Sequence, residues 1–231
     1  MFRSITQSLG AVALAGFAAA THAGTVSFNN VGDAYTTLYS QSFTDSNNPS
    51  PVLLSAEITY SLFSLGTNTA TFNVTVKNTT ATAQAGNNRL IGFGIDVVSP
   101  ALTGASGTST VFQSYFTPGS LPSGVGTLDF CQNSGNGGSC QGGGGGGLFE
   151  QGTESFQLTM NYVSSVPPIS FTNFAVRYQG VGIDSRGSTA FWGCVKDVDA
   201  GCGTTTQMPE PGSLALAGLA LLGLAAARRR A

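Results

Sequence analysis

Apolar and polar side chains alternate with a period of two along much of this chain, and that spacing restricts it to β-strands that bury one face. Two neighbouring runs, residues 54–65 and 70–78, alternate in this way around a Gly-Thr-Asn turn. Their apolar positions are Ile58, Tyr60, Leu62, Phe72, Val74 and Val76. Threonines take many opposite positions, as a half-buried antiparallel sheet requires. The two runs are therefore predicted to form a β-hairpin.

Further runs predict more strands, and none between the two ends of the chain has helical periodicity. The remaining strands are expected at residues 25–28, 33–43, 89–98, 110–116, 155–162 and 169–178. Residues 79–88 and 99–107 are predicted to be loops. Gly92 and Gly94 leave one strand face open, which predicts close approach by a neighbouring backbone or a ligand. The expected fold class is all-β, an antiparallel β-sandwich of about eight to ten strands, with a jelly-roll strand order possible.

The first 23 residues have the three parts of a secretory signal peptide. Arg3 supplies the positive charge, Leu9–Ala20 is the apolar stretch, and small residues precede a cleavage site after Ala23. Gly24 is therefore expected to begin the mature chain. A retained N-terminal anchor helix is the alternative.

Residues 208–231 form a second targeting signal, which follows a short stalk at residues 204–207. A Pro-Glu-Pro break precedes the apolar stretch Gly212–Ala227, which would form a helix of about 24 Å, slightly short of a hydrocarbon core of about 30 Å. The arginines after it predict a cytoplasmic C-terminus. The residues of the break and of the basic tail are Pro209, Glu210, Pro211, Arg228, Arg229 and Arg230.

This order of parts resembles the PEP-CTERM sorting signal of Gram-negative bacteria. The resemblance implies that an exosortase, a membrane enzyme similar to a transpeptidase, recognises and removes the tail. The transmembrane helix at residues 212–227 is therefore expected to be a temporary anchor, not a permanent span.

The region between the two signals, residues 24–207, suits one domain, assigned to residues 24–203. His22, the single histidine, lies in the signal peptide, so the exported domain lacks the histidine of a Ser-His-Asp triad. Arg3, Arg228–Arg230 and Glu210 also lie in the signals, which leaves five basic and ten acidic residues. This mildly acidic balance argues against nucleic-acid binding. With charged residues at only 9% of the chain, solubility must come from hydroxyl and amide groups.

Four cysteines in an exported chain predict disulfides. Their spacing favours the local pairs Cys131–Cys140 and Cys194–Cys202, each stabilising by about 2–3 kcal/mol, while other connectivities remain open. A zinc site of four thiolates is the competing interpretation, but the spacings lack the Cys-x-x-Cys form.

Two carboxylate pairs, Glu150 with Glu154 and Asp96 with Asp129, are the candidates for glycoside hydrolysis. Ordinary surface carboxylates are the favoured interpretation of both. Asp197, Asp199 and Gly201 have the spacing that begins a calcium loop but lack its later glycine and glutamate, so solvated acids are expected there too. No metal and no cofactor are predicted. The glycine tract at residues 142–147 is not followed by Lys-Ser/Thr, so a mobile loop is expected in place of a phosphate-binding loop.

Aromatic residues raise one binding hypothesis. Trp192, Tyr178 and Tyr115 are candidates for stacking on a sugar ring, with Phe191 beside the tryptophan. A tryptophan packed on a disulfide in the core is the competing interpretation.

Landmarks in the domain resemble the cistern group of PEP-CTERM proteins. There are three landmarks, and they occur in this order. The first is the pair of segments 72–80 and 89–97, the second is the tract rich in glycine that begins with a cysteine at residues 140–147, and the third is residues 173–179. The resemblance implies an exported surface or matrix protein and transfers no catalytic residue. The expected function is therefore that of a non-enzymatic protein, sorted by an exosortase and linked to exopolysaccharide or biofilm. A carbohydrate-binding module is the alternative, and a carboxylate hydrolase is the third.

Overall fold

A computed structural model describes residues 24–45, 48–82, 84, 86–135, 139–141, 146–182 and 185–202. The predicted signal peptide with its cleavage site at Ala23, the stalk, and the sorting signal at residues 208–231 lie outside the described residues. Within the described part the chain is all-β and contains no helix. Accordingly, no helix there has the length and apolar character needed to cross a bilayer.

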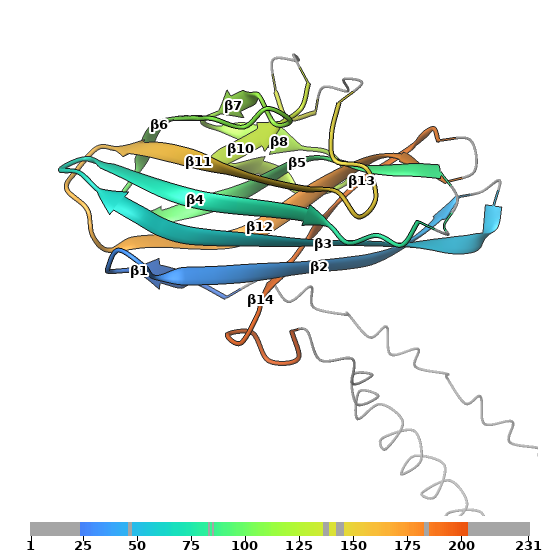
Figure 1. The fold of residues 1–231 in the computed structure, drawn as a ribbon, viewed down its shortest axis with the longest axis horizontal. Coiled ribbons are helices and arrows are strands. Elements are labelled where there is room, and N and C mark those ends of the chain that lie inside the picture. The colour runs from blue at the N-terminus through green and yellow to red at the C-terminus, as the bar shows by residue number, and fades with distance from the viewer. Residues whose placement is uncertain are drawn as a thin grey trace, which may run out of the picture.

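The described residues form fourteen strands. They are β1 (Val26–Phe28), β2 (Ala34–Asp45), β3 (Asn48–Leu65), β4 (Thr69–Asn78), β5 (Gly86–Ser99), β6 (Leu102–Gly107), β7 (Ser114–Phe116), β8 (Gly119–Leu121), β9 (Gly126–Leu128), β10 (Phe130–Asn133), β11 (Thr153–Tyr162), β12 (Ile169–Val181), β13 (Gly187–Trp192) and β14 (Cys194–Val195). Their long members cross the whole molecule in Figure 1.

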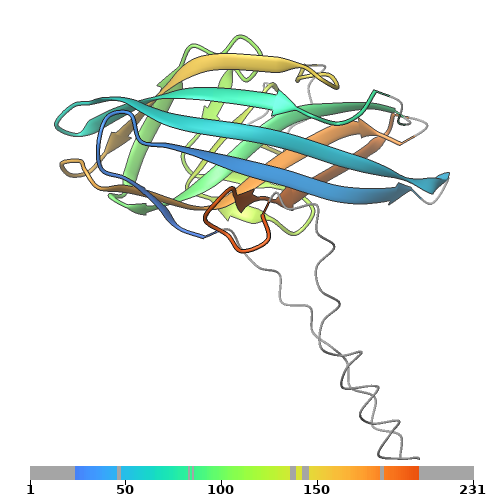
Figure 2. The same ribbon diagram turned by 60° about the horizontal axis from the view of Figure 1, so that its bottom comes forward.

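Two six-stranded sheets lie face to face (Figures 1 and 2). The first sheet has the order β1-β12-β5-β10-β7, with β13 also paired to β12. The second sheet has the order β14-β2-β3-β4-β11-β6. Every recorded pairing is antiparallel, which confirms the predicted sandwich. The sequential meander β2-β3-β4 sets this order apart from a jelly roll of two Greek keys.

The core fills the space between the sheets, as the period-two alternation requires. The predicted hairpin is confirmed as β3 and β4, and all six of its predicted apolar side chains are at most 1% exposed. Phe28, Phe72 and Phe171 join β1, β4 and β12 in one aromatic cluster, with ring centroids 5.1–5.2 Å apart. Such pairs contribute about 0.5–1.5 kcal/mol beyond the area that they bury.

A small second core covers the outer face of the first sheet. Leu121 and Leu128 from the β8–β9 hairpin pack there with Cys131, Cys140 and Ala175. Gly94 makes this contact possible, because an added Cβ would lie 2.6 Å from Leu128 Cδ1 and 2.8 Å from the carbonyl oxygen of Phe130. The predicted close approach at the glycine face is therefore made by the chain's own backbone and a leucine.

Two predictions of local structure are wrong. Residues 102–107 form strand β6 at the edge of the second sheet, although residues 99–107 were expected to be a loop. The segment is rich in glycine and small residues, and its pairing with β11 comes from tertiary contact. The strand count also exceeds the predicted range, because five strands have three residues or fewer.

Candidate functional site

The outer face of the second sheet presents an array of hydroxyl and amide side chains, which we call the hydroxyl face. Strands β2, β3, β4 and β11 supply it, because their inward positions are apolar and their outward ones polar. Its members are Thr36, Thr59, Ser61, Thr71, Asn73, Thr75, Ser155, Gln157 and Thr159. All are exposed or half-buried.

Register places these side chains in rows that cross the strands. In one row the hydroxyls of Thr36 and Thr59 lie 2.8 Å apart, and those of Thr75 and Ser155 lie 2.9 Å apart. Thr59 and Thr75 are direct partners between the two pairs. A hydroxyl offers one donor and two acceptor positions, so each paired group keeps capacity for an outside partner.

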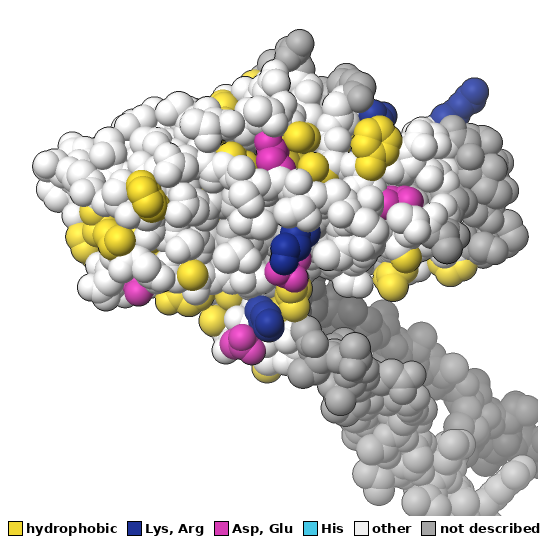
Figure 3. Space-filling view, in the orientation of Figure 1, with side chains coloured by type: hydrophobic (Ala, Val, Ile, Leu, Met, Phe, Trp, Pro, Cys, Tyr) yellow, Lys and Arg dark blue, Asp and Glu magenta, His cyan; other side chains and the backbone are white. Residues whose placement is uncertain are grey.

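Few charges interrupt this face, as Figure 3 shows over β2, β3, β4 and β11. Within the described part of the chain, the one ion pair joins Lys77 Nζ to Glu57 Oε1 at 3.2 Å, on the same face. Both side chains are substantially exposed, so the pair contributes at most about 1 kcal/mol. Sequence reasoning noted the outward threonines but not their alignment, which depends on strand register.

The two predicted glutamates are not brought together in one catalytic pair. Glu150 Oε1 accepts a hydrogen bond from Asn88 Nδ2 at 2.6 Å. Glu154 instead accepts from the turn after β6: Thr110 N at 2.7 Å, Val111 N at 2.9 Å and Ser109 Oγ at 2.9 Å. The contacts of Glu154 are those of a carboxylate that holds a turn.

Asp96 and Asp129 do lie together, in a reciprocal contact with the backbone. Asp129 N donates to Asp96 Oδ1 at 3.1 Å, and Val97 N donates to Asp129 Oδ2 at 2.9 Å. Asn173 Nδ2 also donates to Asp96 Oδ2 at 2.9 Å. Both carboxylates therefore fasten the start of β10 to β5.

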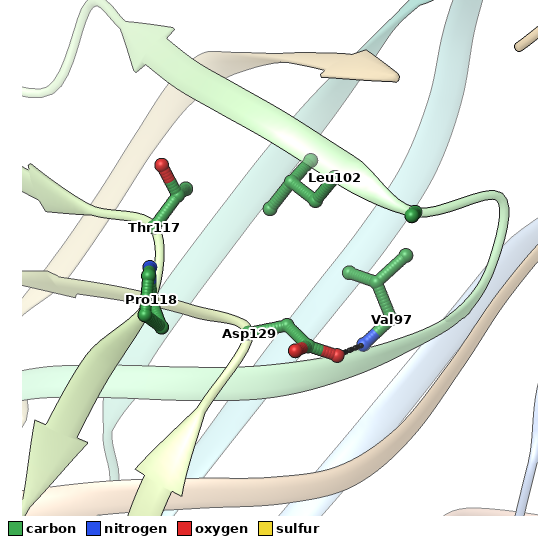
Figure 4. A pocket seen from close by; sticks show the side chains of 6 residues that line it. Val97, Leu102, Thr117, Pro118 and Asp129 are labelled. Atoms are coloured by element: carbon green, nitrogen blue, oxygen red, sulfur yellow. Dashed lines mark hydrogen bonds between the residues drawn. The ribbon is translucent and has the colours of Figure 1, made fainter. Parts of the chain in front are cut away.

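A small cavity adjoins Asp129 (Figure 4). Its volume is about 210 Å³, below the range of about 300–1,000 Å³ typical of small-molecule sites. Its lining comprises Val97, Ala101, Leu102, Thr117, Pro118 and Asp129. Asp129 is the one carboxylate in that lining, so the cavity holds no acid pair.

The three aromatic residues proposed for sugar stacking are dispersed. The prediction is wrong for Tyr178, because its side chain is not at the surface. Tyr178 is fully buried, and its hydroxyl donates to the carbonyl oxygen of Ser55 at 2.6 Å. Its ring stacks on buried Phe191, with centroids 5.8 Å apart and an interplanar angle of 11°. Trp192 is half-buried and packs against the second core. Tyr115 lies on β7, at the far edge of the first sheet.

Both predicted disulfides are present, Cys131–Cys140 and Cys194–Cys202, with Cα atoms 6.3 Å and 5.8 Å apart. The first is buried in the second core, against which Trp192 also packs. Arg177, only 4% exposed, donates from Nη1 to the carbonyl oxygen of Cys140 at 2.7 Å, and burial lowers the pKa of its guanidinium. Residues 142–145 of the glycine tract lie outside the described residues.

The second disulfide closes a loop beside the start of the domain. Asp199 Oδ2 accepts from Val195 N at 2.6 Å, and Asp199 Oδ1 accepts from Gly24 N at 2.7 Å. The carboxylate expected to be solvated, or to begin a calcium loop, is thus held by two backbone groups. No cluster of three potential metal ligands occurs among the described residues.

Comparison with known proteins assigns the C-terminal segment. Residues 209–230 match the family model of the PEP-CTERM protein-sorting motif. The matched range contains the Pro-Glu-Pro break, the apolar stretch and the three arginines. No curated protein and no solved structure was found to match the chain.

Proposed function

We propose that this chain, which carries the PEP-CTERM protein-sorting motif at residues 209–230, is exported and processed at the membrane by an exosortase. Its mature domain is then a non-enzymatic component of the cell surface or extracellular matrix, linked to exopolysaccharide. The sorting motif at residues 209–230 carries the proposal. The motif directs the chain outward, where a disulfide-stabilised domain with few charges is suited to remain.

The contacts of the acidic side chains support a non-enzymatic role. Glu154, Asp96 and Asp129 all accept hydrogen bonds from backbone N–H groups. A carboxylate that acts as acid or base in glycoside hydrolysis instead faces the scissile bond from one side of a pocket. Because these three carboxylates accept structural hydrogen bonds, they favour a structural role for the domain over a catalytic one.

Fractionation of cells tests the sorting part of this proposal. The full chain is expressed in a host that has an exosortase and in a matched strain that lacks it. Wild-type protein is expected to leave the membrane fraction only where the enzyme is present, and Glu210→Ala is expected to remain there. Glu150→Gln, a change in the domain, should sort like the wild type. Release of Glu210→Ala to the same extent as the wild type in the exosortase-positive strain contradicts the proposal, as does release of the wild type from the strain that lacks the enzyme.

Direct binding of polysaccharide is the second candidate function, and the hydroxyl face favours it. Aligned hydroxyl rows on a rigid sheet offer repeated hydrogen-bond donors and acceptors to an extended glycan. This surface replaces the dispersed aromatic residues as the candidate contact.

Retention on isolated exopolysaccharide tests this candidate. The variant Thr59→Val with Thr75→Val removes two hydroxyls at nearly constant volume. Retention is expected to fall by about tenfold or more, since each net hydrogen bond is worth about 0.5–1.5 kcal/mol. The matched control is Ser120→Ala with Thr127→Val, which removes a hydroxyl pair 3.0 Å apart on the β8–β9 hairpin. Equal retention of both variants excludes the hydroxyl face.

A further inference from the structure

The backbone nitrogen of Gly24 lies on a carboxylate. Gly24 N is 2.7 Å from Asp199 Oδ1, across 175 positions of the sequence. Gly24 is also the residue expected to become the N-terminus when the signal peptide is cut after Ala23. A nitrogen that donates one neutral N–H in the precursor would then carry a positive charge.

The loop that holds this carboxylate is fastened on several sides. The Cys194–Cys202 disulfide closes it, and Lys196 N donates to the carbonyl oxygen of Thr36 on β2 at 2.8 Å. Asp199 N donates to the carbonyl oxygen of Val195 at 2.9 Å, and Asp199 Oδ2 accepts from Val195 N. These contacts fix the direction in which Oδ1 points.

The space around Gly24 is just large enough for a glycine beside the Asp199 carboxylate. A Cβ added to Gly24 would lie 2.5 Å from Asp199 Oδ1, so any larger residue would displace the carboxylate. The remaining charged side chains of the loop, Lys196 and Asp197, are exposed. Asp199 is therefore the acid that the backbone of the loop directs at this nitrogen.

We propose that Asp199 is a binding site for the chain's own α-ammonium group, completed when the signal peptide is removed at Gly24. This inference rests on the export part of the proposed function. Cleavage converts a hydrogen bond between a neutral N–H and the carboxylate into an ion pair in which donor and acceptor are both charged, which is shorter and stronger. The new N-terminus is thereby joined to the loop closed by Cys194 and Cys202, which precedes the stalk and the sorting motif in the sequence. Removal of the signal peptide therefore stabilises this loop.

Chemical labelling of the exported protein tests the site. The full precursor is expressed in a Gram-negative host, and the intact mass and N-terminal sequence of the product establish its first residue. Limiting acetylation at pH 7 is then measured at the Gly24 amine relative to Lys77 in the same molecule. A neighbouring carboxylate that raises the pKa of the amine by about one unit slows the reaction about tenfold.

Wild-type protein is therefore expected to react about tenfold more slowly at Gly24 than Asp199→Asn. Asp197→Asn is the matched control, because residue 197 is on the same loop with a φ of 62° that asparagine accepts equally. It should react like the wild type, while Gly24→Ala should react faster. Near pH 10.5 the wild-type and Asp199→Asn rates should converge, since the amine is then largely uncharged in both.

Three results overturn the proposal. Equal rates in the wild type and Asp199→Asn at pH 7 exclude the ammonium site but leave export intact. A rate difference that persists unchanged at pH 10.5 shows loss of steric protection in place of loss of an ion pair. A product that begins at any other residue overturns the site together with the predicted cleavage.

Discussion

The hydroxyl of Tyr178 on β12 donates to the carbonyl oxygen of Ser55 on β3 at 2.6 Å, and so joins the two sheets across the core. Asn78 Oδ1 lies 3.1 Å from the same hydroxyl, and Asn78 Nδ2 donates to the carbonyl oxygens of Asn88 and Leu148. Burial raises the pKa of Tyr178, so the hydroxyl stays protonated and remains a donor. This buried network sets the separation of the sheets at one end of the sandwich.

Tyr178→Phe is expected to lower the free energy of unfolding by about 0.5–1.5 kcal/mol, because it removes the hydrogen bond that joins the two sheets. The loss is limited to that one bond, since the carbonyl oxygen of Ser55 still accepts from Thr79 N and Asn78 Oδ1 still accepts from Thr80 N. Tyr60→Phe is the matched control. Its hydroxyl is buried and has no hydrogen-bond partner among the described residues, so its removal should be neutral or stabilising. Urea denaturation of both variants measures the difference. Equal destabilisation by the two changes would contradict the role of Tyr178.

Replacement of Cys131 and Cys140 by alanine should lower the free energy of unfolding by about 2–3 kcal/mol through loss of a short cross-link. It should also shift the emission of Trp192, the one tryptophan of the chain, because that side chain packs on the second core. Replacement of Cys194 and Cys202 should give a similar loss of stability with little spectral change. Fluorescence-detected denaturation provides both readouts, and identical spectra for the two variants would argue against this packing.

Glu154→Ala should destabilise the domain by about 1.5–3 kcal/mol, because hydrogen bonds to a charged acceptor are stronger than neutral ones. The carboxylate holds backbone N–H groups of Thr110 and Val111, which otherwise lose their acceptor. Glu150→Ala, which removes an acceptor from the side chain of Asn88 alone, should cost less. Thermal and urea unfolding compare the two, and a larger effect at Glu150 would refute the assignment.

The contribution of the turn before β2 to the stability of the domain should be lost at acidic pH. Backbone N–H groups of Asn30 and Asn29 donate to Asp33 and lower its pKa below the ordinary value of 3.8. Because the folded-state pKa is the lower one, this contribution is present above pH 3.8 and is lost as the pH falls through the folded value. Carboxyl NMR titration should show the low pKa. Asp33→Asn should remove this part of the pH dependence of stability, and an unchanged profile would count against it.

Local sequence signals predicted the parts of this fold that depend on near neighbours. The hairpin of β3 and β4 follows from period two and a Gly-Thr-Asn turn, and both disulfides follow from short spacing. Strand β6 could not be predicted, because its small residues become a strand only by pairing with β11.

The misassigned aromatic lies on the face of its strand that alternation turns inward. Tyr178 shares that face of β12 with Phe174 and Val176, and all three belong to the main core. The second core covers the opposite face, so Ala175 is buried too, and alternation, which assigns one face of a strand to solvent, gives no sign of this further layer. The hydroxyl face was likewise beyond prediction, since alignment of Thr59 with Thr75 needs the register of separate strands.

The intact mass of the protein recovered from the surface of exosortase-positive cells tests its assignment as a sorted, processed protein most directly. The expected product begins at Gly24 and lacks the apolar stretch and arginines of residues 212–231, while the matched strain without the enzyme retains them. A surface product that still extends to Ala231 in exosortase-positive cells would contradict processing through the sorting motif.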